Sequence, residues 1–453
     1  MLKQITPPPP LALPLASQLG SSLAPQLPPL SLYVHFPWCV RKCPYCDFNS
    51  HALHGALPEG HYVDCLLRDL ALQAPTAQGR ELHSIFLGGG TPSLFSPSAL
   101  ARFLEGVREQ LELAADVEVT LEANPGTIER GRFADYRAGG ITRVSLGAQS
   151  FDPEQLERLG RIHTAADTER AVDELHAAAL TNFNLDLMYG LPQQTVAQAL
   201  ADIERALALQ PAHISHYQLT LEPGTLFAGR PPPGMPDTDR CADMQLACQQ
   251  RLAEAQYTQY EVSAYARAGA RCRHNLNYWR FGDYLGIGAG AHGKGTRVGH
   301  GALAIERSVR PREPRRYLAS LEDGGAAGAR ELAPTGGTAC ARPGLAGLER
   351  RAIPPAELPF EYLLNALRLN DGFEEKEFEG RTGLCFAVVA PALARAQQRG
   401  LIERSGTRWR ASTLGFNFLN DLLADFLPAG ASGTGVQRGG FIHSAPGSVP
   451  QIS

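Results

Sequence analysis

The sequence predicts an α/β protein: a partial (β/α)6 barrel followed by a winged-helix-like α+β domain. Between residues 31 and 220, short β-rich runs alternate with longer helical patterns, which is typical of βα units around a parallel sheet. Six such units indicate an open, partial barrel rather than a closed eight-fold one. Between residues 358 and 427, helical patterns surround one short β ribbon. The chain is therefore expected to fold as two units.

The barrel elements follow from apolar patterning. Six strands are expected, at residues 31–36, 84–88, 117–122, 141–146, 183–188 and 214–220. Helices are expected between and after them, at residues 60–73, 97–113, 128–138, 165–179 and 196–209. A further helix at 238–255 and a strand-like run at 260–265 extend the barrel, before a Gly-rich run at 284–292.

The pattern of the second unit predicts a winged helix. Helices are expected at residues 360–369, 374–381, 388–399 and 414–426, and a β wing at 401–410. Modules of this kind contact DNA in many proteins, but the third helix carries few bases. Binding to nucleic acid is therefore not expected.

Composition predicts where the folded units and the segments before, between and after them begin and end. Residues 1–30 form a Pro-rich arm that we expect to be disordered, and residues 31–322 form the barrel and its extension. An Ala/Gly/Pro-rich linker is expected at 323–357, the winged-helix-like domain at 358–427 and a disordered Gly/Ser-rich tail at 428–453.

Composition also limits the class of protein. The 453 residues carry a net charge of -4, which gives no reason to expect nucleic acid or an anionic membrane as the main partner. Nine cysteines, an odd number without framework spacing, favour a reducing compartment over a disulfide scaffold. No apolar run is long enough to span a membrane, and the N-terminal arm lacks the features of a signal peptide. A cytoplasmic protein is expected.

Three cysteines directly after the first strand carry the strongest chemical signal. Cys39, Cys43 and Cys46 have a C-x3-C-x2-C spacing, and Phe48 stands where a fourth cysteine would be sought. Three thiolates fix three irons of a 4Fe-4S cluster and leave one iron open for another ligand. The alternatives are a zinc site completed by a distant histidine, and buried structural thiols.

Polar and glycine residues recur where the predicted strands end. The segments are 88–93 after the second strand, 122–126 after the third, 149–151 after the fourth and 186–192 after the fifth. In βα barrels the loops at the carboxyl ends of the strands carry the chemistry. The three glycines at 88–90 would let a small charged ligand approach the backbone, although a tight turn is the plain alternative.

Together, the cysteine loop and the glycine triplet resemble those of the radical S-adenosylmethionine (SAM) enzymes. Tyr33, the run 35–37, the segment 88–92, Gln149 and the segment 186–192 narrow the resemblance to one branch. That branch holds the oxygen-independent coproporphyrinogen III oxidases (dehydrogenases) and the related HemW haem chaperones. The resemblance spans about residues 31–425, so it implies the radical SAM partial barrel for the first unit.

The resemblance also implies residue roles. Cys39, Cys43 and Cys46 would hold the cluster, and the cluster-bound SAM would contact Tyr33, Gly89 and Glu122. The positions that match a second SAM site in the dehydrogenases are Gly90, Thr91, Gln149, Arg161 and Asp186, with Tyr45 near by. The alternative for the two carboxylates is ordinary capping at strand ends.

Within the branch, the sequence favours the chaperones. The dehydrogenases carry a fourth cysteine where this chain has Phe48, and a longer N-terminal arm. The segment 274–279 resembles the H-N-x-x-Y-W motif of the HemW proteins, so His274 is a candidate haem ligand. A core histidine packed among aromatic rings is the alternative.

The expected function is to bind haem and a SAM-ligated cluster and to transfer haem to an acceptor, of a respiratory and membrane-associated kind. The alternative hypothesis is a coproporphyrinogen III dehydrogenase. The sequence does not decide whether the protein is an enzyme. A structural iron–sulfur or zinc module without SAM is a third class. An electron donor is an expected partner, and the resemblance leaves a homodimer open.

Overall fold

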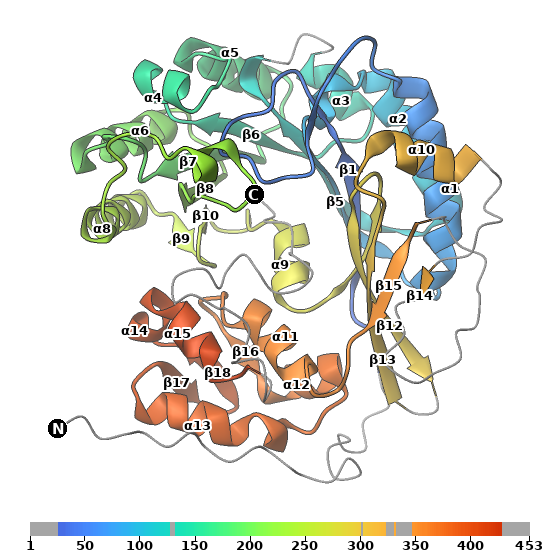
Figure 1. Ribbon diagram of the computed structural model, residues 1–453, viewed down its shortest axis with the longest axis vertical. Coiled ribbons are helices and arrows are strands. Elements are labelled where there is room, and N and C mark those ends of the chain that lie inside the picture. Colours follow the sequence, from blue (N-terminus) through green and yellow to red (C-terminus); the bar gives the residue numbers. More distant parts are fainter. Residues whose placement is uncertain (1–25, 127–131, 300–301, 323–329, 332–346, 428–453) are drawn as a thin grey trace.

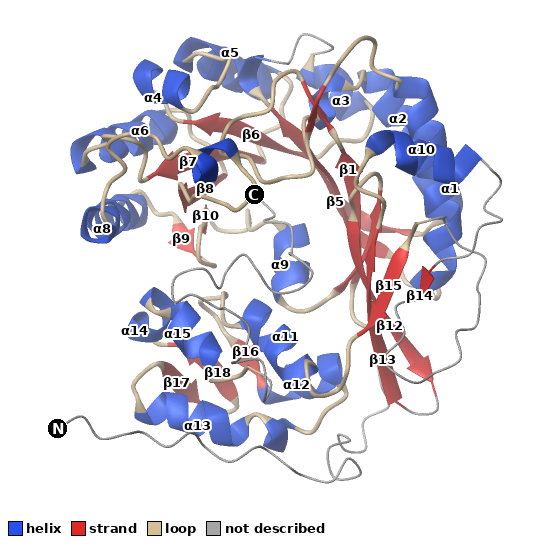
Figure 2. Cartoon of the chain, in the orientation of Figure 1, coloured by secondary structure: helices blue, strands red, loops and turns tan. Residues whose placement is uncertain are grey.

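The computed structural model describes residues 26–126, 132–299, 302–322, 330–331 and 347–427. The described chain is built on a 13-stranded sheet in the order β14-β15-β13-β12-β11-β1-β4-β5-β6-β7-β8-β10-β9. Helices cover the outer face of this curved sheet, while helix α9 (Arg273–Trp279) lies inside the curve (Figure 1, Figure 2). The predicted α/β class is confirmed.

The six predicted barrel strands are confirmed as direct, parallel neighbours in the sheet. They are β1 (Leu30–Phe36), β4 (Leu82–Gly89), β5 (Leu113–Ala123), β6 (Arg143–Gln149), β7 (Phe183–Tyr189) and β8 (His213–Gln218). Strands β1, β6 and β7 are buried along their whole length, as expected when both faces of a parallel sheet are covered. Parallel order brings the carboxyl ends of all six strands to one edge.

The six helices predicted outside the sheet lie close to their predicted positions. They are α1 (Glu59–Ala77), α2 (Pro97–Gln110), α3 (Phe133–Ala138), α5 (Ala165–Ala177), α6 (Val196–Ala208) and α8 (Thr238–Glu254). Three further helices, α4 (Pro153–Arg158), α7 (Leu226–Gly229) and α10 (Pro314–Glu322), are not among the predicted elements. Thr164 and Thr195 begin α5 and α6 with capping boxes, so these ends are encoded locally. The predicted start of α3 at residue 128 lies outside the described residues.

Beyond the six strands, the sheet continues on the side of β1. Strand β11 (Asp283–Ile287) pairs with β1 in parallel, and β12 (His292–Gly299) and β13 (Ala302–Val309) follow antiparallel. The Gly-rich run 284–292 therefore contains a strand and a tight connection. A Cβ on Gly286 would meet the carbonyl oxygen of His292 at 1.8 Å, so only glycine fits there.

The predicted strand at 260–265 is wrong in part. Two short strands, β9 (Thr258–Gln259) and β10 (Ala264–Ala266), flank a turn instead. Within that turn the Glu261 carboxylate accepts hydrogen bonds from the Ser263 amide (2.9 Å) and hydroxyl (2.8 Å). This local side-chain pairing competes with the extended conformation that the apolar pattern predicts.

Part of the predicted linker belongs to the sheet. Strand β15 (Glu349–Ala352) pairs antiparallel with β13, and β14 (Arg330–Glu331) pairs with β15. The backbone pairing and an Arg350–Glu306 ion pair (3.3 Å) hold β15 in place, although its sequence has no apolar alternation. The rest of the predicted linker, at 323–329 and 332–346, lies outside the described residues.

The predicted N-terminal arm is also shorter than expected. Pro28 is buried and its carbonyl accepts a hydrogen bond from Arg80 Nη1 (2.8 Å), and Leu30 already belongs to β1. Residues 26–30 are thus ordered by contact with the barrel, which the proline content alone does not reveal. Residues 1–25 and the predicted tail at 428–453 lie outside the described part of the chain.

The C-terminal unit is built around a second hydrophobic cluster, centred on residues such as Tyr362, Leu393 and Leu422. Phe281 and Ile305 of the barrel extension also belong to this cluster. Its elements are α11 (Leu358–Ala366), β16 (Phe373–Glu374), α12 (Glu375–Thr382), α13 (Ala390–Gln398), β17 (Ile402–Ser405), β18 (Arg408–Ala411), α14 (Thr413–Asn417) and α15 (Leu419–Ala424). The three strands form a small sheet in the order β16-β18-β17. The single helix predicted at 414–426 is broken at Phe418.

Two further expectations concern the whole described chain. None of its helices combines the length and the apolar character needed to cross a bilayer. Each of its eight cysteines is free, as a chain without a disulfide scaffold requires.

Candidate functional site

The three cysteines lie on the loop that leaves the carboxyl end of β1. Cys39 ends the short strand β2 (Trp38–Cys39), which pairs with β3 (His51–Ala52), and a turn bonded from the Cys46 amide to the Cys43 carbonyl (3.2 Å) follows. All three thiols line one cavity at the carboxyl end of the barrel. The strand-end placement expected from the sequence is thus present in the structure.

The donor set fits an iron–sulfur cluster. Among the described residues, no three Cys, His, Asp or Glu side chains converge as ligands of one metal ion. A 4Fe-4S cluster needs one thiolate per iron, and the three thiols that line this cavity match three of its four irons. Burial raises the pKa of Cys39 to about 11 and also raises the pKa of Cys46. A bound cation would therefore favour deprotonation of these thiols.

The wall of the cavity collects residues from the carboxyl ends of five further strands and the loops between them. Its other lining residues are Arg41, Tyr45, Phe48, Ser50, Gly89, Gly90, Thr91, Glu122, Ala123, Asn124, Ser145, Gly147, Gln149, Arg161, Asp186 and Tyr217. Every predicted site residue except Tyr33 and His274 is in this set. The structure thus brings together residues that are up to 178 positions apart, from Cys39 to Tyr217.

The glycine triplet is needed by the chain's own packing. Gly89 has φ +113°, and a Cβ on it would meet the His35 ring at 2.6 Å; a Cβ on Gly90 would meet the Trp38 carbonyl oxygen at 2.6 Å. The Gly89 amide donates to the Glu122 carboxylate (2.9 Å). Gly89 and Gly90 therefore serve close packing on β1 and β2 while they still line the cavity.

Gln149 ends β6 in a strained conformation. Its φ of +67° is unusual for a residue other than glycine, and the pairing of β6 with β7 shifts register between Leu146 and Gln149. The Tyr217 hydroxyl donates to Gln149 Oε1 (2.7 Å). The bulge and this hydrogen bond fix the amide group on the cavity wall.

Arg161 links the cysteine loop to the strand ends. Its guanidinium donates to the Gly147 carbonyl (2.8 Å), to Cys43 Sγ (3.6 Å) and to the Asn124 side chain. The Asn124 amide in turn donates to Thr91 Oγ1 (3.0 Å). Within the described residues, Arg161 Nε is buried without a hydrogen-bond partner. A donor orphaned beside the cavity suits an anionic ligand group such as a carboxylate.

Asp186 lines the same cavity and belongs to a polar network. Its carboxylate accepts from the Ser145 hydroxyl (3.1 Å) and the Asn184 amide (2.7 Å). Asn184 Oδ1 accepts from the Nδ1 of His213 (2.6 Å). Burial raises the pKa of Asp186, while these hydrogen bonds oppose the shift.

Tyr33 lies behind the cavity wall. Its ring is buried, and its hydroxyl hydrogen-bonds to His35 Nδ1 (2.9 Å). Burial lowers the pKa of His35 to about 4, so the ring is neutral, and its Nε2 donates to the Asn49 carbonyl (2.9 Å). His35 Nδ1 must then accept from Tyr33, which leaves the tyrosine bound to protein. In this structure Tyr33 reaches the site through His35 and Gly89.

His274 also lies away from the cavity. It is 1% exposed on α9, inside the barrel, where its Nδ1 pairs with the Ser84 hydroxyl (3.2 Å). The Phe86 ring lies 5.0 Å and the Tyr33 ring 6.3 Å from it, between ring centroids. These contacts are those of the alternative, a core histidine packed among aromatic rings, and its role as a haem ligand stays a prediction.

Asn124, Tyr217 and Ser145 also line the cavity, although the sequence does not predict them as site residues. Asn124 lies in the segment 122–126, whose strand-end position was the available signal. Ser145 and Tyr217 lie within β6 and β8, and only the direction of their side chains brings them to the cavity. The alternation of side chains along a strand predicts which face each side chain points to, but it does not predict which residues that side chain contacts.

The fold and the three-cysteine cavity are those of a radical SAM protein. Residues 33–206 match the radical SAM superfamily, and residues 353–418 match the HemN C-terminal domain. The fold is similar to that of the coproporphyrinogen III oxidase HemN of Escherichia coli, a radical SAM enzyme, with a TM-score of 0.69 over 88% of this chain and 90% of that chain. At 20% identity this likeness shows the fold alone.

The curated relatives are more specific. The chain is 47% identical to the haem chaperone HemW of Escherichia coli and 46% identical to that of Haemophilus influenzae, in each case over 89% of this chain and 99% of the relative. It is 35% identical to the mitochondrial radical S-adenosyl methionine domain-containing protein 1 of Bos taurus, over 90% of this chain and 89% of that protein. The chain therefore belongs to the HemW family.

Proposed function

We propose that this protein is a haem chaperone that binds haem, a 4Fe-4S cluster and SAM, and passes haem to an acceptor protein. The 47% identity to a HemW haem chaperone over nearly its whole length carries the proposal. The cavity with Cys39, Cys43 and Cys46 supports the cofactor part of it. The second hydrophobic cluster, formed mainly by residues 353–426, supports the proposed division into a barrel unit and a C-terminal unit.

The cavity residues suggest how SAM is held. The three cysteines would hold the cluster, and the Gly89 backbone and Glu122 would bind the cluster-bound SAM, with Tyr33 acting from behind through His35. Gly90, Thr91, Gln149, Arg161 and Asp186, with Tyr45, line the part of the wall proposed for a second SAM. When bound, a reduced cluster of this kind supplies an electron to the SAM sulfonium.

The protein's partners belong to the same proposal. The acceptor would be a respiratory, membrane-associated haem protein, the chaperone itself would be cytoplasmic, and an electron donor would reduce the cluster. A homodimer is a proposed assembly. Nucleic acid is not a proposed partner, because the net charge of -4 gives no counterion-driven attraction to phosphate.

The test uses one anaerobic preparation with a reconstituted cluster. Haem titration followed by absorbance should show stoichiometric binding, and incubation with an apo haem protein should transfer the haem. In parallel, coproporphyrinogen III is offered with SAM and a reductant, and no turnover is expected. Protoporphyrinogen IX formation that is lost in Cys39→Ser would overturn the proposal in favour of the oxidase. The absence of haem binding would overturn the proposal without favouring the oxidase.

A further inference from the structure

A cationic face borders the loop that carries the three site cysteines. It consists of Arg41 and Lys42 of that loop and of Arg312, Arg315 and Arg316, all of which are exposed. Among the described residues, none of these five side chains forms an ion pair. The whole chain has a net charge of -4, so these cations are concentrated against the overall charge. A concentration of this kind attracts an anionic partner.

Asn49 joins the two segments of the cationic face. Its Nδ2 donates to the Arg312 carbonyl (2.8 Å) and to the Ala289 carbonyl (2.9 Å), so the segment that begins at Arg312 is held against the end of the cysteine loop. Burial lowers the pKa of His51, and the charges of Lys42 and Arg312 lower it further, because this ring lies near both cations. The two segments therefore form one surface.

The fold does not explain Arg315 and Arg316. They lie in the first turn of α10, where the helix dipole disfavours positive charge. The Glu313 carboxylate accepts hydrogen bonds from their backbone amides (3.1 and 2.7 Å), but within the described chain their guanidinium groups pair with no carboxylate. The only other carboxylate of the segments 39–51 and 310–316 is that of Asp47. Unpaired cations at an unfavourable position indicate a contact outside the fold.

Large apolar side chains are exposed beside the same loop. Val40 is 50% exposed and Ile162 is 51% exposed, and both line a small cavity next to the cysteine loop. Leu226 of α7 is 72% exposed, and it lies beside the loop because the Phe227 amide donates to the Pro44 carbonyl (3.1 Å). Clustered exposed apolar residues next to charged ones are typical of a protein–protein contact.

We propose that an acidic one-electron redox protein docks on the cationic face and on Val40, Ile162 and Leu226, and there reduces the 4Fe-4S cluster. This inference rests on the proposed function and identifies the electron donor by its chemistry. One electron leaves the reduced flavin or iron–sulfur centre of the donor, which is thereby oxidised, and enters the oxidised 4Fe-4S cluster. No bond is formed or broken in this step.

The position of the face favours an electron donor over other anionic partners. The cations Arg41 and Lys42 stand on the same loop as Cys39, Cys43 and Cys46, so a protein seated there is close to the proposed cluster. Electron transfer slows steeply with distance, whereas a haem acceptor or an anionic membrane has no need of this proximity. Electron-transfer partners also form small interfaces, which a face of this size can supply.

The experiment measures docking of a plant-type ferredoxin, an acidic one-electron carrier, to the full chain with its reconstituted cluster. Titration with oxidised ferredoxin should show binding that weakens as the ionic strength rises. Arg312→Glu and Arg316→Glu should each weaken binding by about threefold to tenfold and reduce its salt dependence. Leu226→Ser should weaken binding without changing the salt dependence, because it removes an apolar contact.

A second readout is the rate at which the visible absorbance of the cluster bleaches. Reduced ferredoxin should bleach Arg312→Glu and Arg316→Glu more slowly than the wild type. Photoreduced deazariboflavin, a small uncharged reductant, should bleach all of them at one rate, which shows that the cluster itself is intact. Both substituted arginines are exposed and lie outside the cysteine cavity.

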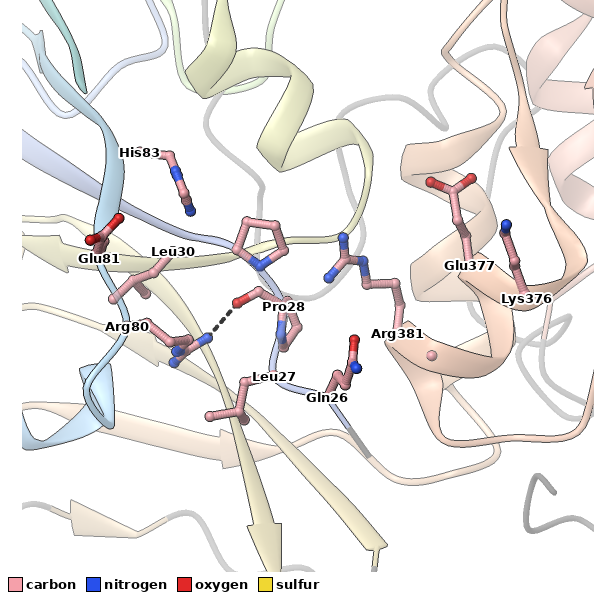
Figure 3. Close-up of a pocket in the computed structure, with 12 residues that line it drawn as sticks. Gln26, Leu27, Pro28, Leu30, Arg80, Glu81, His83, Lys376, Glu377 and Arg381 are labelled. Carbon is pink, nitrogen blue, oxygen red and sulfur yellow. Dashed lines mark hydrogen bonds between the residues drawn. The ribbon is translucent and has the colours of Figure 1, made fainter. Parts of the chain in front are cut away.

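Lys376→Glu is the matched control. Lys376 is exposed on α12, beside the cavity at the amino ends of β1 and β4 (Figure 3), whereas the cysteine loop leaves the carboxyl end of β1. In the described part of the chain it forms no ion pair. The variant makes the same change in net charge as Arg312→Glu, so it should bind and accept electrons from ferredoxin as the wild type does.

The other outcomes overturn the docking face. They are a wild type that does not bind ferredoxin, and arginine variants that match Lys376→Glu. Arginine variants that keep ferredoxin binding but lose haem transfer to an apo haem protein, or lose binding to anionic phospholipid vesicles, would assign the face to the acceptor or to a membrane. A haem titration of the same preparation tests the proposed function separately, because ferredoxin binding is measured without haem.

Discussion

The Gly89 amide donates a hydrogen bond of 2.9 Å to the Glu122 carboxylate, and so joins the ends of β4 and β5 at the cysteine cavity. Gly89 keeps this position only because it has no side chain, with φ +113° and the His35 ring behind it. His35 is itself held on both ring nitrogens, by Tyr33 and by the Asn49 carbonyl. The cavity wall is therefore supported by a rigid second layer.

Gly89→Ala should destabilise the protein. The new Cβ would lie 2.6 Å from a ring atom that is hydrogen-bonded in place, and the positive φ adds strain. We expect a loss of at least about 2 kcal/mol in the free energy of unfolding and weaker SAM binding. Denaturant unfolding and a SAM titration measure the two effects. In Gly79→Ala, which has φ +75° but open space, only about 1 kcal/mol should be lost.

The three site cysteines should each be required for the cluster. Cys39→Ser, Cys43→Ser and Cys46→Ser should each lower the bound iron after reconstitution and remove the visible absorbance, because each thiolate holds one iron. Cys385, which lies outside the cavity, provides the control. If a serine variant at any of the three positions kept full iron content, that residue would not be a ligand.

The six barrel strands could be predicted because apolar runs of parallel strands stand out from the helical patterns between them. Strand β15 (Glu349–Ala352) could not be predicted, because its residues show no apolar alternation. It pairs with β13 through backbone hydrogen bonds and the Arg350–Glu306 ion pair. Residues 26–30 were assigned to a disordered arm because proline content says nothing about the Arg80 donor that binds Pro28. Tertiary contacts decide such segments.

The sequence predicts those residues of the candidate site that lie at the carboxyl ends of neighbouring parallel strands. The cysteines, Glu122, Gln149 and Asp186 were found because each follows or ends a strand of one parallel sheet. The burial of Tyr33 and His274 could not be predicted, because the assignment of a residue to a strand or helix does not tell whether its side chain is buried.

The neutral His35 predicts a pH dependence of stability. Burial lowers its pKa to about 4 in the folded protein, below the ordinary value of about 6.5 in the unfolded chain. The unfolded chain thus binds more protons on this ring between those values. The stabilising contribution is complete above about pH 6.5, is lost as the pH falls toward about 4, and amounts to about 3 kcal/mol.

The difference in unfolding free energy between wild type and His35→Gln measures this contribution. That difference should shrink as the pH falls from about 7 to about 4. Burial raises the pKa of Asp202 to about 6, which has the opposite effect on stability, but it is common to both proteins and cancels. A difference that stayed constant over this range would mean that the pKa of His35 is not lowered in the folded protein.

Asn184 should be a positioning residue for Asp186. Its amide donates to Asp186 (2.7 Å) and to the Ser145 hydroxyl (2.7 Å), while its Oδ1 accepts from His213 (2.6 Å). Asn184→Ala would leave these buried groups without partners, at a cost of about 2 kcal/mol. SAM should also bind about tenfold more weakly, because the carboxylate on the cavity wall loses its orientation. Thermal unfolding and SAM titration check both, with Asn370→Ala, which removes a hydrogen bond to the Gln259 carbonyl, as the control. Equal SAM affinity in Asn184→Ala and the control would mean that Asp186 keeps its orientation without Asn184, and that the network beneath the cavity serves the fold alone.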